Sequence, residues 1–187
     1  MRPLMRPLPR SFYDRPTELV AHDLLGKILV HRVNGEQRCG RIVEVEAYVG
    51  PHDLAAHTSR GLTKRTQAMF GPPGHAYIYL IYGIYHCMNV VTEREGHGSG
   101  VLLRALEPLC GLSGNTRGPG LLSRAMGIDR SLYGADLCGD TLFLTQDPAP
   151  QPFEIVRRPR IGVAYAGAWA DAALRFLIGG NPYVSRK

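Results

Sequence analysis

The sequence lacks any long apolar run, and its 187 residues contain no stretch near the length of a membrane span. The opening segment "MRPLMRPLPRSF" has arginines and prolines but no apolar core of a secretory signal. We therefore expect a cytoplasmic protein that does not enter a membrane. Residues 1–10 are predicted to form a disordered basic arm, and residues 11–187 a single domain, because no linker or composition change divides them.

Paired cysteine motifs are also absent. The four cysteines, Cys39, Cys87, Cys110 and Cys138, are widely scattered and form no C-x-x-C pair. This spacing argues against a zinc ribbon or a thiol redox centre. In a chain without a secretory signal, such cysteines are most often free thiols in or near the core, and we expect that here.

Lysine is scarce. Lysine and arginine together number 22, but only Lys27, Lys64 and Lys187 are lysines, and the net charge is +6. Arginine suits bidentate contact with phosphates, so the balance permits a polyanionic partner. A biased genome composition explains it equally well, and both interpretations stay open at this point.

The remaining patterns predict an α+β fold. Asn34-Gly35, flanked by β-branched residues, predicts a hairpin over 27–50 with a bulge near Gly40. Helices are expected over 13–26, capped by Asp14, and over 118–127. Strands are expected at 76–91, interrupted at Gly83, and in "SGVLLRALEP", "DTLFLTQD" and "LRFLIGG". We predict one domain built around a curved antiparallel β-sheet, with flanking helices and a protruding β-hairpin.

Carboxylates and histidines supply the first candidate site. The period of two places Glu44, Glu46 and Tyr48 on one strand face. Two carboxylates there suit the activation of water, although spacing alone favours a solvated face. The stretch "HDLAAH" adds His52, Asp53 and His57, but histidines five apart are weak support for a metal site. Surface histidines or a non-metal role are favoured.

Two further residues are unusual for their positions. Tyr82 precedes Gly83 at the expected hairpin tip, where a tyrosine gains little from the core but can insert between bases. Arg104 lies inside an apolar strand, where an unpaired guanidinium is costly. Its expected partner is Glu46 or Glu107, either in a structural ion pair or to orient a catalytic carboxylate or a phosphate.

Several long motifs together resemble one family. They are "EVEAYVGPHDLAAH", "MFGPPGHAYIYLIYGIYHCMNVV", "GVLLRALEP", "GPGLLSRAMGI", "RIGVAYAG" and "NPYVS". In this order they are similar to the alkyladenine (3-methyladenine) DNA glycosylase family over nearly the whole chain after residue 10. The resemblance implies an enzyme that removes damaged purines from double-stranded DNA, acting as a monomer without cofactor or metal.

The resemblance also implies roles for residues in these motifs. Glu46 would be the general base, and Arg104 and a main-chain carbonyl near Ile161 would help to hold the water. Tyr48 and His57 would pack on the base.

On the other side of the base, Tyr79 would form the opposite wall, and Asn89 would crowd the exocyclic amine of normal guanine. Tyr82 would fill the gap left in the duplex, with Ile84 beside it where relatives commonly have methionine.

These roles imply a mechanism that the sequence supports. The enzyme would flip out alkylated or deaminated purines, hydrolyse the N-glycosidic bond with a Glu46-activated water and leave an abasic site. With three lysines and none in a pocket motif, a water nucleophile is favoured over a Schiff base. Two alternatives remain: a nucleic-acid-binding module without catalysis, and a metal-dependent hydrolase of small molecules.

Overall fold

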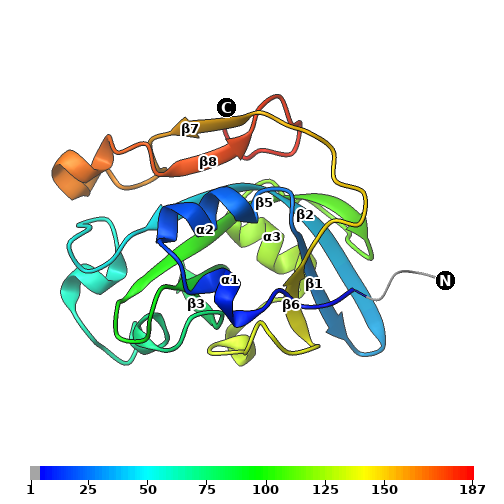
Figure 1. Ribbon diagram of the computed structural model, residues 1–187, viewed down its shortest axis with the longest axis horizontal. Helices are drawn as coiled ribbons and strands as arrows, with labels where there is room; N and C mark the ends of the chain where they lie inside the picture. The colour runs from blue at the N-terminus through cyan, green and yellow to red at the C-terminus, as the bar shows by residue number, and fades with distance from the viewer. Residues whose placement is uncertain (1–4) are drawn as a thin grey trace.

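The computed structural model describes residues 5–187, which form one sheet with helices packed around it (Figure 1). The α-helices and 3-10 helices are α1 Arg10–Tyr13, α2 Thr17–Leu24, η1 His57–Arg60, η2 Gln67–Phe70, α3 Pro119–Met126, η3 Arg130–Leu132 and η4 Ala164–Ala170. The strands are β1 Ile28–Val33, β2 Glu36–Tyr48, β3 Ala76–Ile81, β4 Tyr85–Thr92, β5 Ser99–Cys110, β6 Leu142–Thr145, β7 Ile155–Arg158 and β8 Arg175–Ile178.

All strand pairs in residues 5–187 are antiparallel, and the order along the sheet is β3-β4-β5-β2-β1-β6. The long strand β2 is the branch point, because β1 pairs with its first half and β8 pairs with residues 44–46, with β7 outside β8. Its register against β5 shifts at 39/40 and between residues 42 and 45. The sheet curls around its core, which confirms the predicted α+β class with a curved antiparallel sheet.

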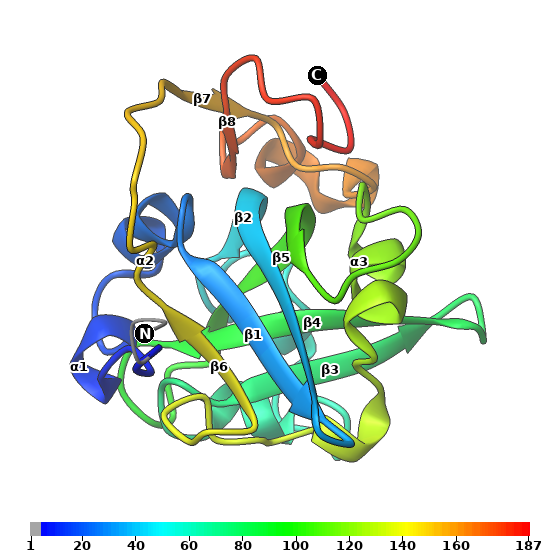
Figure 2. The same cartoon turned by 90° about the vertical axis from the view of Figure 1, so that its right-hand side faces the viewer.

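Both predicted hairpins are present, and each turns on residues with positive φ. Asn34 and Gly35 have φ of 52° and 77°, and Tyr82 and Gly83 have φ of 52° and 70°. Asn and Gly tolerate this left-handed region, whereas a tyrosine there is uncommon. The β3–β4 hairpin extends beyond the body of the molecule, past α3 (Figure 2). The predicted protruding hairpin therefore carries Tyr82 at its tip.

The helices follow the predicted positions, but one cap differs. In α3, Pro119 opens the helix and Gly127 closes it in the left-handed conformation, as predicted. For α2, the N-cap is Pro16 rather than Asp14, and the side chain of Glu93 accepts the Thr17 N–H at 3.2 Å. Glu93 belongs to the β4–β5 connection, so a distant carboxylate replaces the predicted local cap.

The expected arm over residues 1–10 is only partly within the described chain, since residues 1–4 lie outside it. From residue 5 onward the segment packs on the domain. Leu8 is buried and donates its N–H to the carbonyl of Leu144, and Arg10 pairs with Asp136 at 2.8 Å. Helix α1, which begins at Arg10, and strand β7 were not predicted from the sequence.

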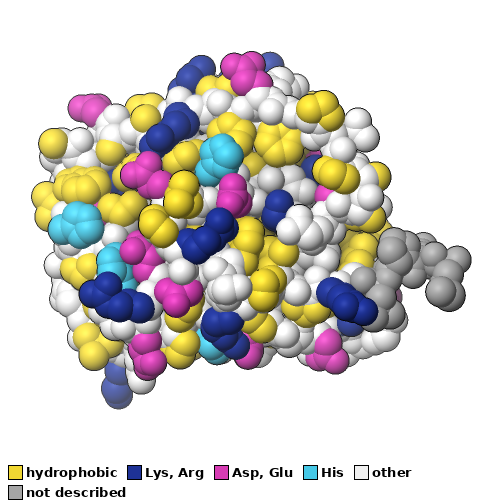
Figure 3. All heavy atoms as spheres, in the orientation of Figure 1, with side chains coloured by type: hydrophobic (Ala, Val, Ile, Leu, Met, Phe, Trp, Pro, Cys, Tyr) yellow, Lys and Arg dark blue, Asp and Glu magenta, His cyan; other side chains and the backbone are white. Residues whose placement is uncertain are grey.

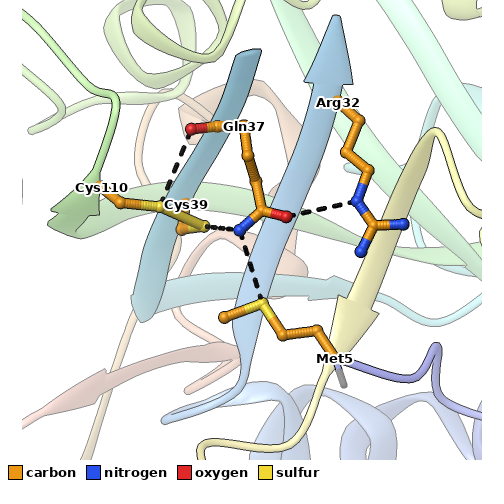
Figure 4. The surroundings of a disulfide bond; sticks show 5 residues. All are labelled: Met5, Arg32, Gln37, Cys39 and Cys110. Carbon is orange, nitrogen blue, oxygen red and sulfur yellow. Dashed lines mark hydrogen bonds between the residues drawn. A yellow bond between two sulfur atoms is a disulfide. The ribbon is translucent and has the colours of Figure 1, made fainter. Parts of the chain in front are cut away.

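The expectation of four free thiols is wrong for two of them. Cys39 of β2 and Cys110 of β5 form a disulfide, with their Cα atoms 4.9 Å apart (Figure 4). The strand register places them opposite each other although 71 residues separate them. The amide of Gln37 donates to the sulfur atoms of Cys39 and Met5 at 3.4 and 3.8 Å. Cys87 and Cys138 are free.

The face that carries α1 and α2 mixes charges of both signs (Figure 3). Two acidic residues of α2 form ion pairs, Asp23 with Arg15 and Glu18 with Arg157. The tip of the β3–β4 hairpin points away from this face, as comparison of Figures 1 and 2 shows. No helix within residues 5–187 is long and apolar enough to cross a membrane.

Candidate active site

A cavity of about 430 Å³ lies between the β3–β4 hairpin, the middle of β2 and β5, and the loop before η4. It gathers residues from across the chain: its lining includes Glu46, Tyr48, His57, Tyr79, Tyr82, Asn89, Arg104 and Ile161. These are all of the predicted site residues except Ile84. A second cavity, of about 460 Å³, lies near Lys27 and Arg41 and contains none of them.

Glu46 lies in the wall of the cavity and is fully buried. Its Oε2 accepts the Tyr48 hydroxyl at 2.8 Å, and its Oε1 accepts the Ile161 N–H at 2.8 Å. Burial raises the pKa of the Glu46 carboxyl, although Arg104 and the two hydrogen-bond donors act in the opposite direction. A carboxyl whose pKa is raised by burial in a cavity is typical of a general base.

Arg104 joins two carboxylates of the β2 strand, Glu44 and Glu46. Its guanidinium lies 3.4 Å from Glu46 and 3.2 Å from Glu44, which also pairs with Arg175 at 3.1 Å. Both glutamates are fully buried, so the solvated face favoured by spacing alone is wrong. Of the two partners expected for Arg104, Glu46 is confirmed, whereas Glu107 pairs with Arg41.

Aromatic rings enclose the cavity next to Glu46. Tyr48 follows Glu46 on β2, and Tyr79 lies on β3, with His57 from η1 packed edge-on against Tyr79 at 4.6 Å between ring centroids. Burial, together with the neighbouring Arg65, lowers the pKa of His57 to about 4, so its imidazole is neutral at pH 7. These side chains offer flat faces that suit a stacked purine.

Tyr77 of β3 and Asn89 of β4 also line the cavity. Asn89 is buried and donates its amide to the Tyr77 carbonyl at 3.2 Å. The Tyr77 hydroxyl lies 3.0 Å from Nδ1 of His57. Sequence reasoning gave Tyr77 no role in the site, so its contact with His57 was missed. The β3–β4 register brings Tyr77 opposite Asn89, which a pattern within one strand does not reveal.

The two predicted DNA-inserting residues differ in placement. Tyr82 is 84% exposed at the hairpin tip and also lines the cavity mouth, whereas Ile84 is 64% exposed and lies outside the lining. An exposed tyrosine in a left-handed conformation is unfavourable for folding.

The main chain at Ile161 lies beside Glu46, and its N–H donates to the carboxylate. The contact of a carbonyl near Ile161 with the water stays a prediction. Sequence reasoning also missed Arg65 and Tyr165, which line the cavity. Tyr165 is exposed, and its hydroxyl donates to the Ala55 carbonyl at 3.2 Å.

Two residues of the metal-hydrolase alternative, His52 and Asp53, do not line the cavity that holds Glu46 and His57. Asp53 pairs with Arg160, His52 packs edge-on against Trp169, and His57 contacts Tyr77. In the chain from residue 5 onward, no three His, Cys, Asp or Glu side chains form a group that could hold a metal ion.

Comparison with known proteins agrees with this geometry. The family model described as methylpurine-DNA glycosylase (MPG) matches residues 11–182. A protein of Legionella pneumophila (strain Lens) named "Putative 3-methyladenine DNA glycosylase" is 60% identical, covering 97% of this chain and all of its own. A protein of the same name from Anaeromyxobacter dehalogenans (strain 2CP-1) is 56% identical over 96% of this chain and 85% of its own. Another, from Myxococcus xanthus (strain DK1622), is 50% identical over 96% of this chain and 93% of its own. The chain therefore belongs to the methylpurine-DNA glycosylase family.

Proposed function

We propose that this enzyme rotates an alkylated or deaminated purine out of duplex DNA into the cavity and hydrolyses its N-glycosidic bond. The observation that carries this proposal is a fully buried carboxylate, Glu46, in the wall of a cavity enclosed by Tyr48, His57 and Tyr79. A base inside a duplex cannot be reached in place, so the cavity must receive it flipped.

The chemistry follows from the position of Glu46. Its ionised carboxylate takes a proton from water as the oxygen bonds to C1′ and the C1′–N bond breaks. The bonding electrons leave with the purine, and the sugar remains as an abasic site. The carboxylate also stabilises positive charge that develops on the sugar. Arg104 fixes the carboxylate by its contact with Oε1.

A water nucleophile fits the side chains present. All three lysines lie within the described residues, and none of them lines the cavity. A lyase-type reaction needs an amine that can form a Schiff base with the sugar. The residues that this mechanism uses come from one chain, so the proposal needs no second subunit.

The surface around the cavity mouth suits duplex DNA as a partner. Beside the cavity runs a groove of about 370 Å³ that contains Lys64, Arg65 and Arg130, and it shares Arg65 and Tyr79 with the cavity lining. Cations in such a groove can contact phosphates on either side of an extruded nucleotide. A binding module without catalysis does not account for the buried Glu46, because carboxylates repel phosphates.

A base-release assay tests the proposal directly. The enzyme is incubated with methylated duplex DNA, with and without EDTA, and free purines and abasic sites are quantified. We expect equal release in both conditions. Absence of release would refute the glycosylase function, and release that EDTA abolishes would favour the metal-dependent hydrolase.

Tyr82→Ser is expected to weaken binding to a duplex with a damaged base by roughly 10-fold or more, and to change single-strand binding far less. The stacked ring offsets part of the cost of unstacking, at about 1–3 kcal/mol per aromatic–base contact. Fluorescence anisotropy with both DNA forms measures the two affinities.

Leu19→Ser is the matched control for Tyr82→Ser, because Leu19 is an exposed apolar residue on α2, the face opposite the hairpin tip. It should leave both affinities unchanged. Equal losses of duplex and single-strand binding in Tyr82→Ser would argue against insertion into the base stack.

A further inference from the structure

Asp53 and Arg160 form an ion pair whose side chains are both fully buried. Nη2 of Arg160 donates to Oδ1 of Asp53 at 2.9 Å, and Nη1 donates to Oδ2 and to the Ala47 carbonyl. Asp53 also accepts the N–H groups of Val49 and Ala55. The pair therefore joins the loop after β2 to the segment that precedes η4.

Arg160 lies over one face of the Tyr48 ring. Its guanidinium carbon is 4.7 Å from the centroid of that ring. Tyr48 lines the cavity whereas Arg160 does not, so a base that stacks on Tyr48 from the cavity would meet the ring face that Arg160 leaves free. The next residue, Ile161, donates its N–H to Glu46. Arg160 thus fixes both Tyr48 and the main chain at the catalytic carboxylate.

A cation on one face of an aromatic ring changes what the other face attracts. The negative electrostatic potential at a ring face attracts cations. A guanidinium on one face makes the potential at the other face less negative. A cationic purine stacked on that other face therefore gains less from Tyr48 than it would from an isolated ring. A neutral purine loses little, because its stacking depends chiefly on dispersion and buried area.

We propose that the Asp53–Arg160 pair is a specificity-determining element, which disfavours cationic purines relative to neutral ones by acting through Tyr48. This inference rests on the proposed base-release function. Alkylation at N7 of guanine gives a cationic base, whereas deaminated adenine, hypoxanthine, is neutral. The pair would raise the rate of release of neutral purines relative to that of cationic purines. Bond cleavage is intrinsically slower for the neutral class.

The test compares two substrates in the double variant Asp53→Asn/Arg160→Met. Duplexes of one sequence contain either 7-methylguanine or hypoxanthine, and single-turnover rate constants are measured for each. We expect the ratio of 7-methylguanine to hypoxanthine release to rise about threefold or more over the ratio of the unmodified enzyme. A purely structural role would lower both rates together and leave the ratio unchanged.

The matched control is Arg41→Met/Asp147→Asn, which removes a partly buried ion pair of β2 that lies outside the cavity. Its ratio should equal that of the unmodified enzyme. If the first double variant does not fold, Arg160→Gln removes the charge and keeps an amide donor for the Ala47 carbonyl. An unchanged or lowered ratio in the folded variant overturns the inference. Failure of the unmodified enzyme on both substrates instead refutes the proposed function.

Discussion

Replacing Glu46 by Gln is expected to slow base release by about 10²–10⁴-fold, the usual contribution of a general base. The amide has the same size as the carboxylate and still accepts a hydrogen bond, but it cannot take a proton from water. Binding to damaged duplex should therefore stay within a few-fold. Single-turnover release from methylated DNA measures the first quantity, and fluorescence anisotropy measures the second.

The pH dependence supplies an independent readout of the same residue. The base must be ionised to act, so the rate of the unmodified enzyme should rise with pH through the pKa of Glu46. Burial raises that pKa, which moves the rise above the ordinary range for a glutamate. Glu46→Gln should lose this rise.

Glu107→Gln is the matched control for Glu46→Gln, because Glu107 lies on β5 outside the cavity and pairs with Arg41. It should keep both the rate and its pH dependence. Normal turnover by Glu46→Gln would show that the catalytic base has been assigned wrongly.

Replacing Glu44 by Ala is expected to lower the free energy of unfolding by about 3–5 kcal/mol. Glu44 is fully buried and accepts hydrogen bonds from Arg104, Arg175 and the Ser185 N–H. Its removal leaves two nearly buried guanidinium groups without their shared carboxylate, and the desolvation of those charges is no longer compensated. Urea unfolding followed by circular dichroism measures the change.

The comparison for Glu44→Ala is a surface ion pair. Glu18 pairs with Arg157 where both side chains are about half exposed. Glu18→Ala should change stability by less than about 0.5 kcal/mol, since water solvates and screens exposed charges. A loss below about 1 kcal/mol in Glu44→Ala would contradict the role assigned to the network.

Glu44 and Glu46 of β2 show which features depend on local sequence and which depend on distant strands. Strand periodicity correctly places Glu44 and Glu46 together, because alternation is a property of the backbone. Their burial depends on β5 and β8, which flank residues 44–46 on both sides. Arg104 and Arg175 reach Glu44 from those two strands. Spacing within one strand says nothing of such neighbours, and it favoured the wrong, solvated face.

The family motifs nevertheless identified residues that gather at one cavity. Eight of the nine residues that the resemblance implied lie around one cavity, although they come from segments far apart in the chain. The exception, Ile84, lies on the same hairpin as Tyr82 but faces solvent. Their catalytic and binding roles remain predictions for the experiments above.

By itself, the sequence determined features that arise within a few residues of one another. The Asn34-Gly35 turn and the α3 helix between Pro119 and Gly127 follow from local backbone preferences, and Gly83 marks the turn of the second hairpin.

Only the tertiary structure decided the pairings between distant residues. The Cys39–Cys110 disulfide, the capping of α2 by Glu93 and the position of Arg160 over Tyr48 depend on strand register and on how loops pack. Register is set by the burial of the whole sheet, so no short stretch of sequence carries that information.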